Sequence, residues 1–164
     1  MAAGGIANGS VAVLNHSRVD HNQAPNGLGA GVVNHGMMTL NHSEVNRNTA
    51  AASGFAGSGG GILNTEGPPG TTPAVLTLDH SRVNGNSAGG FGGGIANGVP
   101  LPPGPPPLIG GEVTLKDSQV KHNTAAHGGG IFNSGGTVTL QASMVTGNQV
   151  DNCEPTGTIA GCTN

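Results

Sequence analysis

Three histidines occupy the same position of a pattern that recurs along the chain: His16, His42 and His80. The later copies hold Asp117 and Ala142 there. Imidazole nitrogens are common metal ligands, and a row of them about 5 Å apart could hold an ion. One row, however, offers its ligands along a line rather than a tetrahedron, and no carboxylate is fixed beside it in the first two copies. We therefore interpret the row as a solvated turn and predict no metal and no other cofactor.

A second candidate for chemistry is a group of four charged residues, Asp79, His80, Lys116 and Asp117, which occupy equivalent positions of neighbouring copies. Cleavage of a polysaccharide needs a basic residue and a carboxylate on one face. The simpler interpretation is ion pairing between copies, and the alternating column of Arg18, Glu44 and Arg82 supports it. No reaction follows from these residues, so they remain catalytic candidates only.

Composition argues against several other classes of protein. The glycine clusters complete neither a dinucleotide-binding motif nor a P-loop, and we interpret them as tight corners. Five Lys and Arg against eight Asp and Glu give a net charge of -3, which predicts no nucleic-acid partner. No apolar run is long enough to span a membrane. With no Trp or Tyr, a sugar-stacking platform is also poorly supported.

The elements that must position these residues are five copies of one template, G-G-G-[IV]-x-N, V-T-L, S-x-V-x-x-N, seen most clearly in residues 128–148. Apolar and outward residues alternate around a central leucine, which is typical of a β-strand. A period of 20 to 50 residues with matched inward positions indicates a solenoid. The central leucines are Leu14, Leu40, Leu78, Leu115 and Leu140.

Two asparagine columns are filled in every copy, and a serine column accompanies them. Stacked asparagines can donate and accept hydrogen bonds along a column, so they can satisfy buried turns. We predict an all-β fold: a right-handed parallel β-helix of five coils, each with three short strands. The ladder residues are Asn8, Asn34, Asn64, Asn97 and Asn133 in one column, and Asn22, Asn48, Asn86, Asn123 and Asn148 in the other.

The predicted solenoid covers residues 1–150, and a tail covers 151–164. Proline-rich inserts, 65–74 and 98–111, enlarge the same corner of the third and fourth coils. Cys153 and Cys162 lie close together in the tail; a local disulfide there implies an oxidising compartment, and two unpaired thiols are the alternative. The coils run approximately over 1–27, 28–58, 59–91, 92–127 and 128–150.

The pairing of GGGIxN with SxVxxN resembles the repeats of polymorphic outer-membrane and autotransporter passenger domains. It is more similar still to secreted bacterial right-handed β-helix repeat proteins, and the closing DNCxPxGxIxGC resembles a tail found on some of them. The resemblance implies a secreted or surface-exposed scaffold, adhesin or carbohydrate-active enzyme. No signal peptide precedes Gly4, so we expect either that an export signal was removed or that this is part of a longer chain.

The outward side of the glycine-led strand is apolar at Val33, Leu63 and Phe132. The proline inserts either fold over this row or leave it as a surface for a partner. The first coil has no cap, so we expect it to stack on another molecule, as a homo-oligomer or filament. We predict a non-enzymatic structural or adhesive module with a glycan or protein partner. A carbohydrate-binding or carbohydrate-cleaving β-helix is the alternative, and ice binding by the outward threonines is a minor one.

Overall fold

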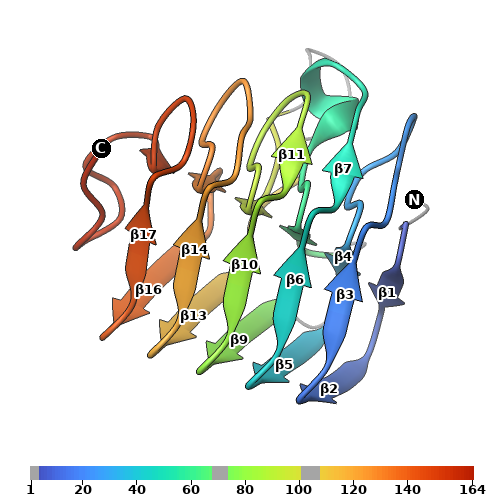
Figure 1. Ribbon diagram of the computed structural model, residues 1–164, viewed down its shortest axis with the longest axis vertical. Helices are drawn as coiled ribbons and strands as arrows, with labels where there is room; N and C mark the ends of the chain where they lie inside the picture. Colours follow the sequence, from blue (N-terminus) through green and yellow to red (C-terminus); the bar gives the residue numbers. More distant parts are fainter. Residues whose placement is uncertain (1–3, 68–73, 101–107) are drawn as a thin grey trace.

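The computed structural model describes residues 4–67, 74–100 and 108–164, and it confirms a parallel β-solenoid (Figure 1). The chain winds through three parallel sheets, and each turn of the coil adds one strand to each sheet. Strands of neighbouring coils pair in register, so residues of one template column lie on top of one another. The repeat therefore translates directly into stacked rows of like residues.

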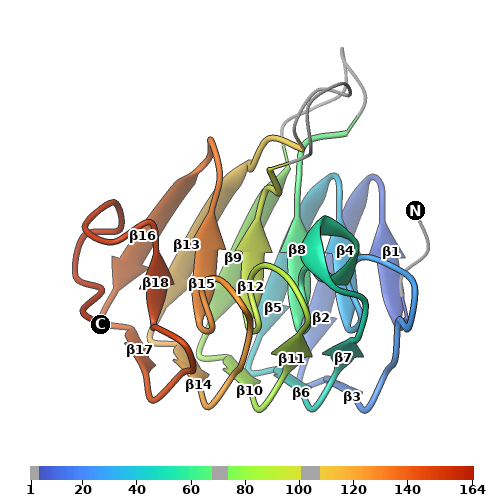
Figure 2. The same ribbon diagram turned by 90° about the horizontal axis from the view of Figure 1, so that it is seen from above.

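Sheet A consists of the glycine-led strands, and Figure 2 shows them in order along the stack. The glycine before each strand lies where two coils approach closely. A Cβ on Gly61 would lie 2.5 Å from the carbonyl oxygen of Gly94 and 3.0 Å from the Asn86 amide nitrogen. Any larger residue there would push the coils apart. The strands are β1 (Ile6–Asn8), β4 (Val32–Asn34), β8 (Ile62–Asn64), β12 (Ile95–Asn97), β15 (Ile131–Asn133) and β18 (Cys153–Glu154).

Sheet B holds the central leucines. Its strands alternate between inward and outward side chains, as the sequence predicts, and the outward threonines stack in register. Those threonines form a single row that begins at Val13, so the hydroxyl array is narrow. The strands are β2 (Val11–Asn15), β5 (Met37–Asn41), β9 (Val75–Asp79), β13 (Glu112–Lys116) and β16 (Thr137–Gln141).

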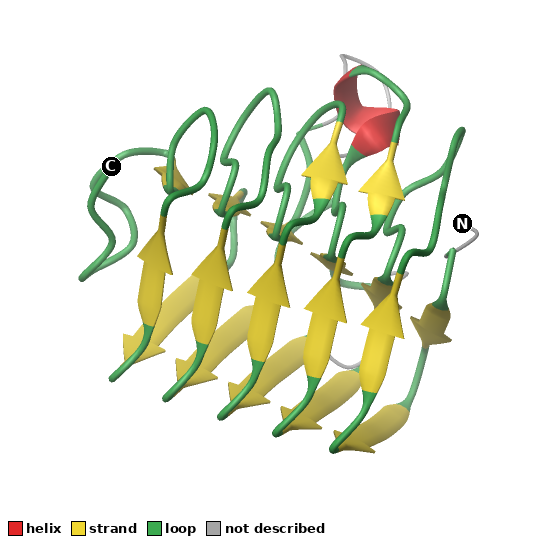
Figure 3. Ribbon diagram, viewed as in Figure 1, coloured by secondary structure: helices red, strands yellow, loops and turns green. Residues whose placement is uncertain are grey.

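Sheet C follows a sharp corner after sheet B, and its central valines point inward. Its strands are β3 (Arg18–Asp20), β6 (Glu44–Asn46), β10 (Arg82–Asn84), β14 (Gln119–Lys121) and β17 (Met144–Thr146). Two short strands, β7 (Thr49–Ala50) and β11 (Ser87–Ala88), pair beyond it. The longest corner there contains a 3₁₀ helix at Gly54–Gly57, drawn in red in Figure 3.

The interior is a column of aliphatic side chains, one set from each coil, enclosed by the three sheets. Leu40, Leu78 and Leu115 are fully buried in it. Because each coil buries its apolar residues only against the coils above and below, stability depends on stacking. The terminal coils differ accordingly: Leu14 and Leu140 are only partly buried.

Both asparagine columns form continuous ladders, as predicted. In the first, each side-chain nitrogen donates to the side-chain oxygen of the next coil at 2.8–2.9 Å. In the second, the backbone N–H and the side-chain nitrogen both donate to the next asparagine oxygen at 2.8–3.0 Å. The serine column repeats this at 3.0 Å from backbone N–H to hydroxyl. All three ladders donate toward the C-terminus.

The outward apolar row of sheet A is buried, which corrects the idea that it is an open surface for a partner. Leu63 is 0% exposed and Phe132 is 7% exposed, and Val33 is also buried. Val99 and Leu108, which pair at the base of the second insert, pack on this row together with Leu28 and Phe91 from the opposite corner. The row is therefore a second, smaller core. The middles of both proline-rich inserts, 68–73 and 101–107, lie outside the described residues.

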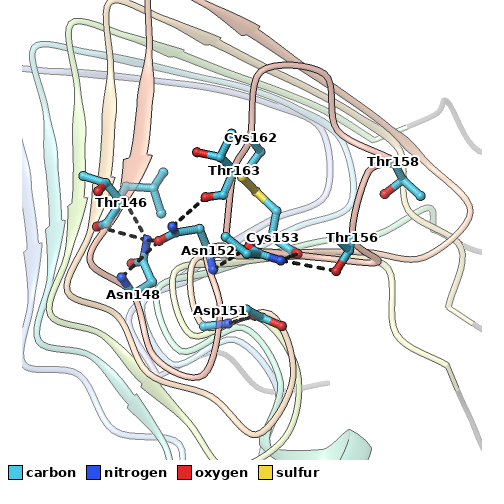
Figure 4. Close-up of a disulfide and its surroundings, with 12 residues drawn as sticks. Thr146, Asn148, Asp151, Asn152, Cys153, Thr156, Thr158, Cys162 and Thr163 are labelled. Atoms are coloured by element: carbon cyan, nitrogen blue, oxygen red, sulfur yellow. Dashed lines mark hydrogen bonds between the residues drawn. A yellow bond between two sulfur atoms is a disulfide. The ribbon is translucent and has the colours of Figure 1, made fainter.

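The tail continues the solenoid beyond its fifth coil. β18 pairs with β15, which places Cys153 directly beyond Ile131 in the inward column. The side-chain oxygen of Asn152 accepts hydrogen bonds from the backbone and side chain of Asn148, so it substitutes for the next ladder residue (Figure 4). The predicted Cys153–Cys162 disulfide is present, and the buried Ile159 joins the core at this end.

Candidate functional site

The histidine row lies on the corner between sheets B and C. Its members and the two residues that continue it all have a positive φ of 47–49°, the left-handed backbone that a sharp corner requires. Among residues with a Cβ, histidine, asparagine and aspartate adopt this conformation most readily. The left-handed backbone of the corner therefore explains most of the residue types in this row. The row consists of His16, His42, His80, Asp117 and Ala142.

The three imidazoles stack face to face. The ring centroids of His16 and His42 are 5.1 Å apart, and those of His42 and His80 are 4.9 Å apart, with interplanar angles of 13° and 5°. In parallel rings the nitrogen lone pairs lie in the ring planes, so they run side by side instead of converging on one point. Within the described ranges, no group of three His, Cys, Asp or Glu residues is arranged to hold a metal ion.

The four charged candidates for catalysis do come together at this same corner. Asp79 and Lys116 are register partners in β9 and β13, and His80 Nδ1 contacts Asp79 Oδ1. The adjacent Ser81 is no free nucleophile. Its buried hydroxyl accepts from the Ser43 N–H in the serine ladder, and its one proton is shared between the carbonyl oxygens of Asp79 and Leu40, 2.9 and 3.0 Å away. The group forms an exposed charged patch rather than a cleft.

A polar hollow lies in the outward face of sheet C. It has a volume of about 270 Å³ and lies over three successive strands, β3, β6 and β10. A second hollow, over the corner that carries His16 and His42, shares Arg18 and Glu44 with the first. The two hollows adjoin at these shared residues, so the polar depression runs from the corner onto sheet C, along the strands. The first is lined by Arg18, Asp20, Glu44, Asn46, Arg47, Arg82, Asn84 and Gly85.

Two arginines of this depression form ion pairs, one of them within a coil and two between coils. The Arg18 guanidinium lies 3.3 Å from Asp20 and 3.0 Å from Glu44, and Arg82 lies 3.6 Å from the other Glu44 oxygen. The sequence predicts such cross-coil pairing from the alternation of Arg18, Glu44 and Arg82. Both arginine side chains remain more than half exposed, so these pairs contribute little stability and leave donors free for a ligand.

Every cationic residue of the chain belongs to this face, which the separate columns of the repeat do not reveal. Arg18, Arg82 and Lys121 stand on sheet C, while Arg47 and Lys116 stand at the two corners beside it. The sequence does carry a signal for this, since all five positions belong to the stretch from the end of the leucine strand to the second asparagine. These positions belong to different columns of the template. Only when neighbouring columns are placed around the coil is it clear that the Lys and Arg residues lie on one side of the molecule.

Comparisons with known proteins identify no relative: no family model, curated protein or solved structure matches the chain. The resemblance to secreted bacterial β-helix repeat proteins therefore stays a prediction. Among the described residues, no helix is long and apolar enough to cross a membrane.

Proposed function

We propose that this chain is a non-enzymatic structural module, secreted or displayed on a cell surface, that joins a second copy through its first coil. The observation that carries the proposal is the difference between the two ends of the solenoid. At the first coil, β1, β2 and β3 are edge strands with no tail packed on them in the described part of the chain, whereas at the last coil β18 pairs with β15 and Ile159 packs on the core, leaving β16 and β17 as edges. Open edges favour pairing with another strand.

The hydrogen bonds between the first two coils show which backbone groups of β2 face away from the second coil. Met37 N–H donates to Ser10, and His16 N–H donates to Asn41. Successive residues of a strand direct their backbone groups to opposite sides, so Val11 and Val13 direct theirs away from the second coil. The backbone of β2 thus presents free donors and acceptors to a partner strand.

Exposed apolar side chains gather beside this edge. Val11 is 69% exposed, Val13 is 56% exposed, and Met37 in the next coil is 51% exposed. Ile6, Ala12 and Leu14 are only partly buried at the open end of the core. Pairing of the edge with a second copy would remove this apolar surface from water, which is favourable.

The opposite end is less suited to stacking, which supports a closed dimer over a filament. β18 covers the edge of β15 in sheet A, Asn152 satisfies the last ladder asparagine, and Ile159 packs on the core. A second copy that meets the first edge to edge around a twofold axis uses the open end of both chains. The disulfide fits the oxidising conditions outside the cytoplasm.

Sedimentation velocity from micromolar to millimolar protein tests the proposal. We expect a reversible monomer–dimer equilibrium that Val13→Lys weakens about tenfold, because an edge lysine opposes strand pairing. Thr139→Lys is the matched control: it adds the same charge to the same outward row at the other end, and should leave dimerisation unchanged. A wild-type protein that stays monomeric throughout contradicts the proposal. Equal weakening by both variants would indicate head-to-tail stacking instead.

A further inference from the structure

The charges of the molecule are segregated. Sheet C and its two flanking corners carry all five Lys and Arg residues of the chain, together with four acidic residues. The other four acidic residues lie on the remaining parts of the molecule, where no Lys or Arg stands. A net charge of -3 therefore divides into a slightly positive face and a distinctly negative remainder. An anionic ligand would be directed to the sheet C face.

Two oxygens in the main hollow lack partners. Asp20 Oδ1 and Asn46 Oδ1 are buried from solvent, and neither has a hydrogen-bond partner in the described residues. A buried acceptor without a donor costs about 1–3 kcal/mol, so a movement that brings either oxygen to a ligand donor would be favourable. Asp20 and Asn46 line the same hollow as Arg18, Arg47 and Arg82, and a turn of either side chain toward the hollow would expose its oxygen to a ligand.

The arginines and the two unpaired oxygens together limit which kind of ligand the hollow could bind. Arginines recognise carboxylate, sulfate or phosphate groups, often through two parallel hydrogen bonds. The unpaired carboxylate and amide oxygens need hydroxyl or N–H donors from the same ligand. An acidic sugar carries both an anionic group and several hydroxyls. The backbone of double-stranded DNA supplies the anions without the hydroxyls.

The repetition of this face favours a chain over a single sugar. The rows of residues that line the main hollow repeat once per coil along the stack. Arg18 and Arg82 are two coils apart, about 10 Å at strand spacing. We propose that the outward face of sheet C binds an extended acidic polysaccharide along the stack, with its anionic groups on the arginines and hydroxyls on Asp20 and Asn46.

Isothermal titration with polygalacturonate at neutral pH and low salt tests this site, with neutral dextran and double-stranded DNA as comparison polymers. We expect binding to polygalacturonate and none to dextran, and weaker binding to DNA. Arg82→Gln should lower the affinity about tenfold, and Arg82→Lys should lower it less, since it keeps the charge but loses the planar fork. Asn46→Ala should weaken binding as well, by removing an acceptor for a hydroxyl.

Glu112→Gln on sheet B is the control, because it changes the net charge away from the face and should leave affinity unchanged. Arg47→Gln provides a second test at the hollow if Arg82→Gln impairs folding. The proposal is overturned if polygalacturonate does not bind, if dextran or DNA binds equally well, or if the arginine variants bind like the wild type. Affinity for the polymer and self-association are separate measurements, so this site stands or fails independently of the dimer.

Discussion

At the scale of single residues, the fixed positions of the repeat serve the fold. Asn86 illustrates this: its oxygen accepts from the backbone and side chain of Asn48, and its side-chain nitrogen donates to Val45 and Asn123. Few other side chains could make all these bonds in one buried position. The ladder residues are therefore recognisable from sequence as identical columns, and they carry no chemistry for a ligand.

Replacing Asn86 with alanine should lower the free energy of unfolding by about 3 kcal/mol, because several buried backbone and amide groups lose their partners. Urea unfolding, followed by circular dichroism, measures the change. Asn84→Ala is the control; Asn84 lies on the outward face of the adjacent strand, is exposed, and should change stability by less than about 0.5 kcal/mol. A loss below about 1 kcal/mol for Asn86→Ala would show that the ladder is dispensable.

Ala142 tests the explanation of the histidine row as a set of corner residues. Its φ of 47° is unfavourable for alanine, which lacks the local hydrogen bonds of asparagine or aspartate. Ala142→Gly should therefore raise stability by about 0.5–1 kcal/mol. Ala7→Gly, in the extended strand β1, should lower it by a similar amount. Destabilisation by Ala142→Gly would contradict the left-handed corner.

At the scale of elements, the sequence predicts the strands of the three sheets far better than the corners between them. Matched columns alone determine the register of β9 against β13, because a slip would turn the leucines outward. The cover over the outward row of sheet A was only partly foreseeable. The inserts suggested one half of it, but Leu28 and Phe91 come from a corner whose length and sequence differ in every coil.

The tail shows the same limit. Its disulfide follows from two nearby cysteines, whereas the substitution of Asn152 for a ladder residue and of Cys153 for an inward isoleucine does not. The tail lacks the repeat template, so no column links it to the coils. The charged hollow could not be predicted from the template for another reason. Its lining residues occupy positions that the template leaves free, and the residue types at these positions differ from coil to coil.

Leu63→Ala tests the second core. Because Leu63 is fully buried under the cover, truncation should cost about 2–4 kcal/mol. If the row faced solvent, as a free partner surface would, the cost would be close to zero. Val13→Ala provides the exposed comparison and should change the urea midpoint little.

At the scale of the whole molecule, the described residues form a solenoid with open strand edges at its first coil, a last coil covered in part by the tail, and one charged long face. Dimerisation through the open end would place two charged faces in a fixed relation and double the binding surface offered to a polymer. Two linked sites bind a long ligand more tightly than one, through effective concentration. A rigid, paired scaffold of this kind suits a surface role without any reaction at its face.

Amide hydrogen exchange at Val11 and Val13, followed by NMR at low and high protein concentration, tests the central claim of edge pairing most directly. Both amides point to the open side of β2, so the account predicts fast exchange in dilute protein and protection in concentrated protein. The amide of Leu140, which points away from the stack at the other end, should exchange quickly in both. Fast exchange of Val11 and Val13 at every concentration would contradict the account.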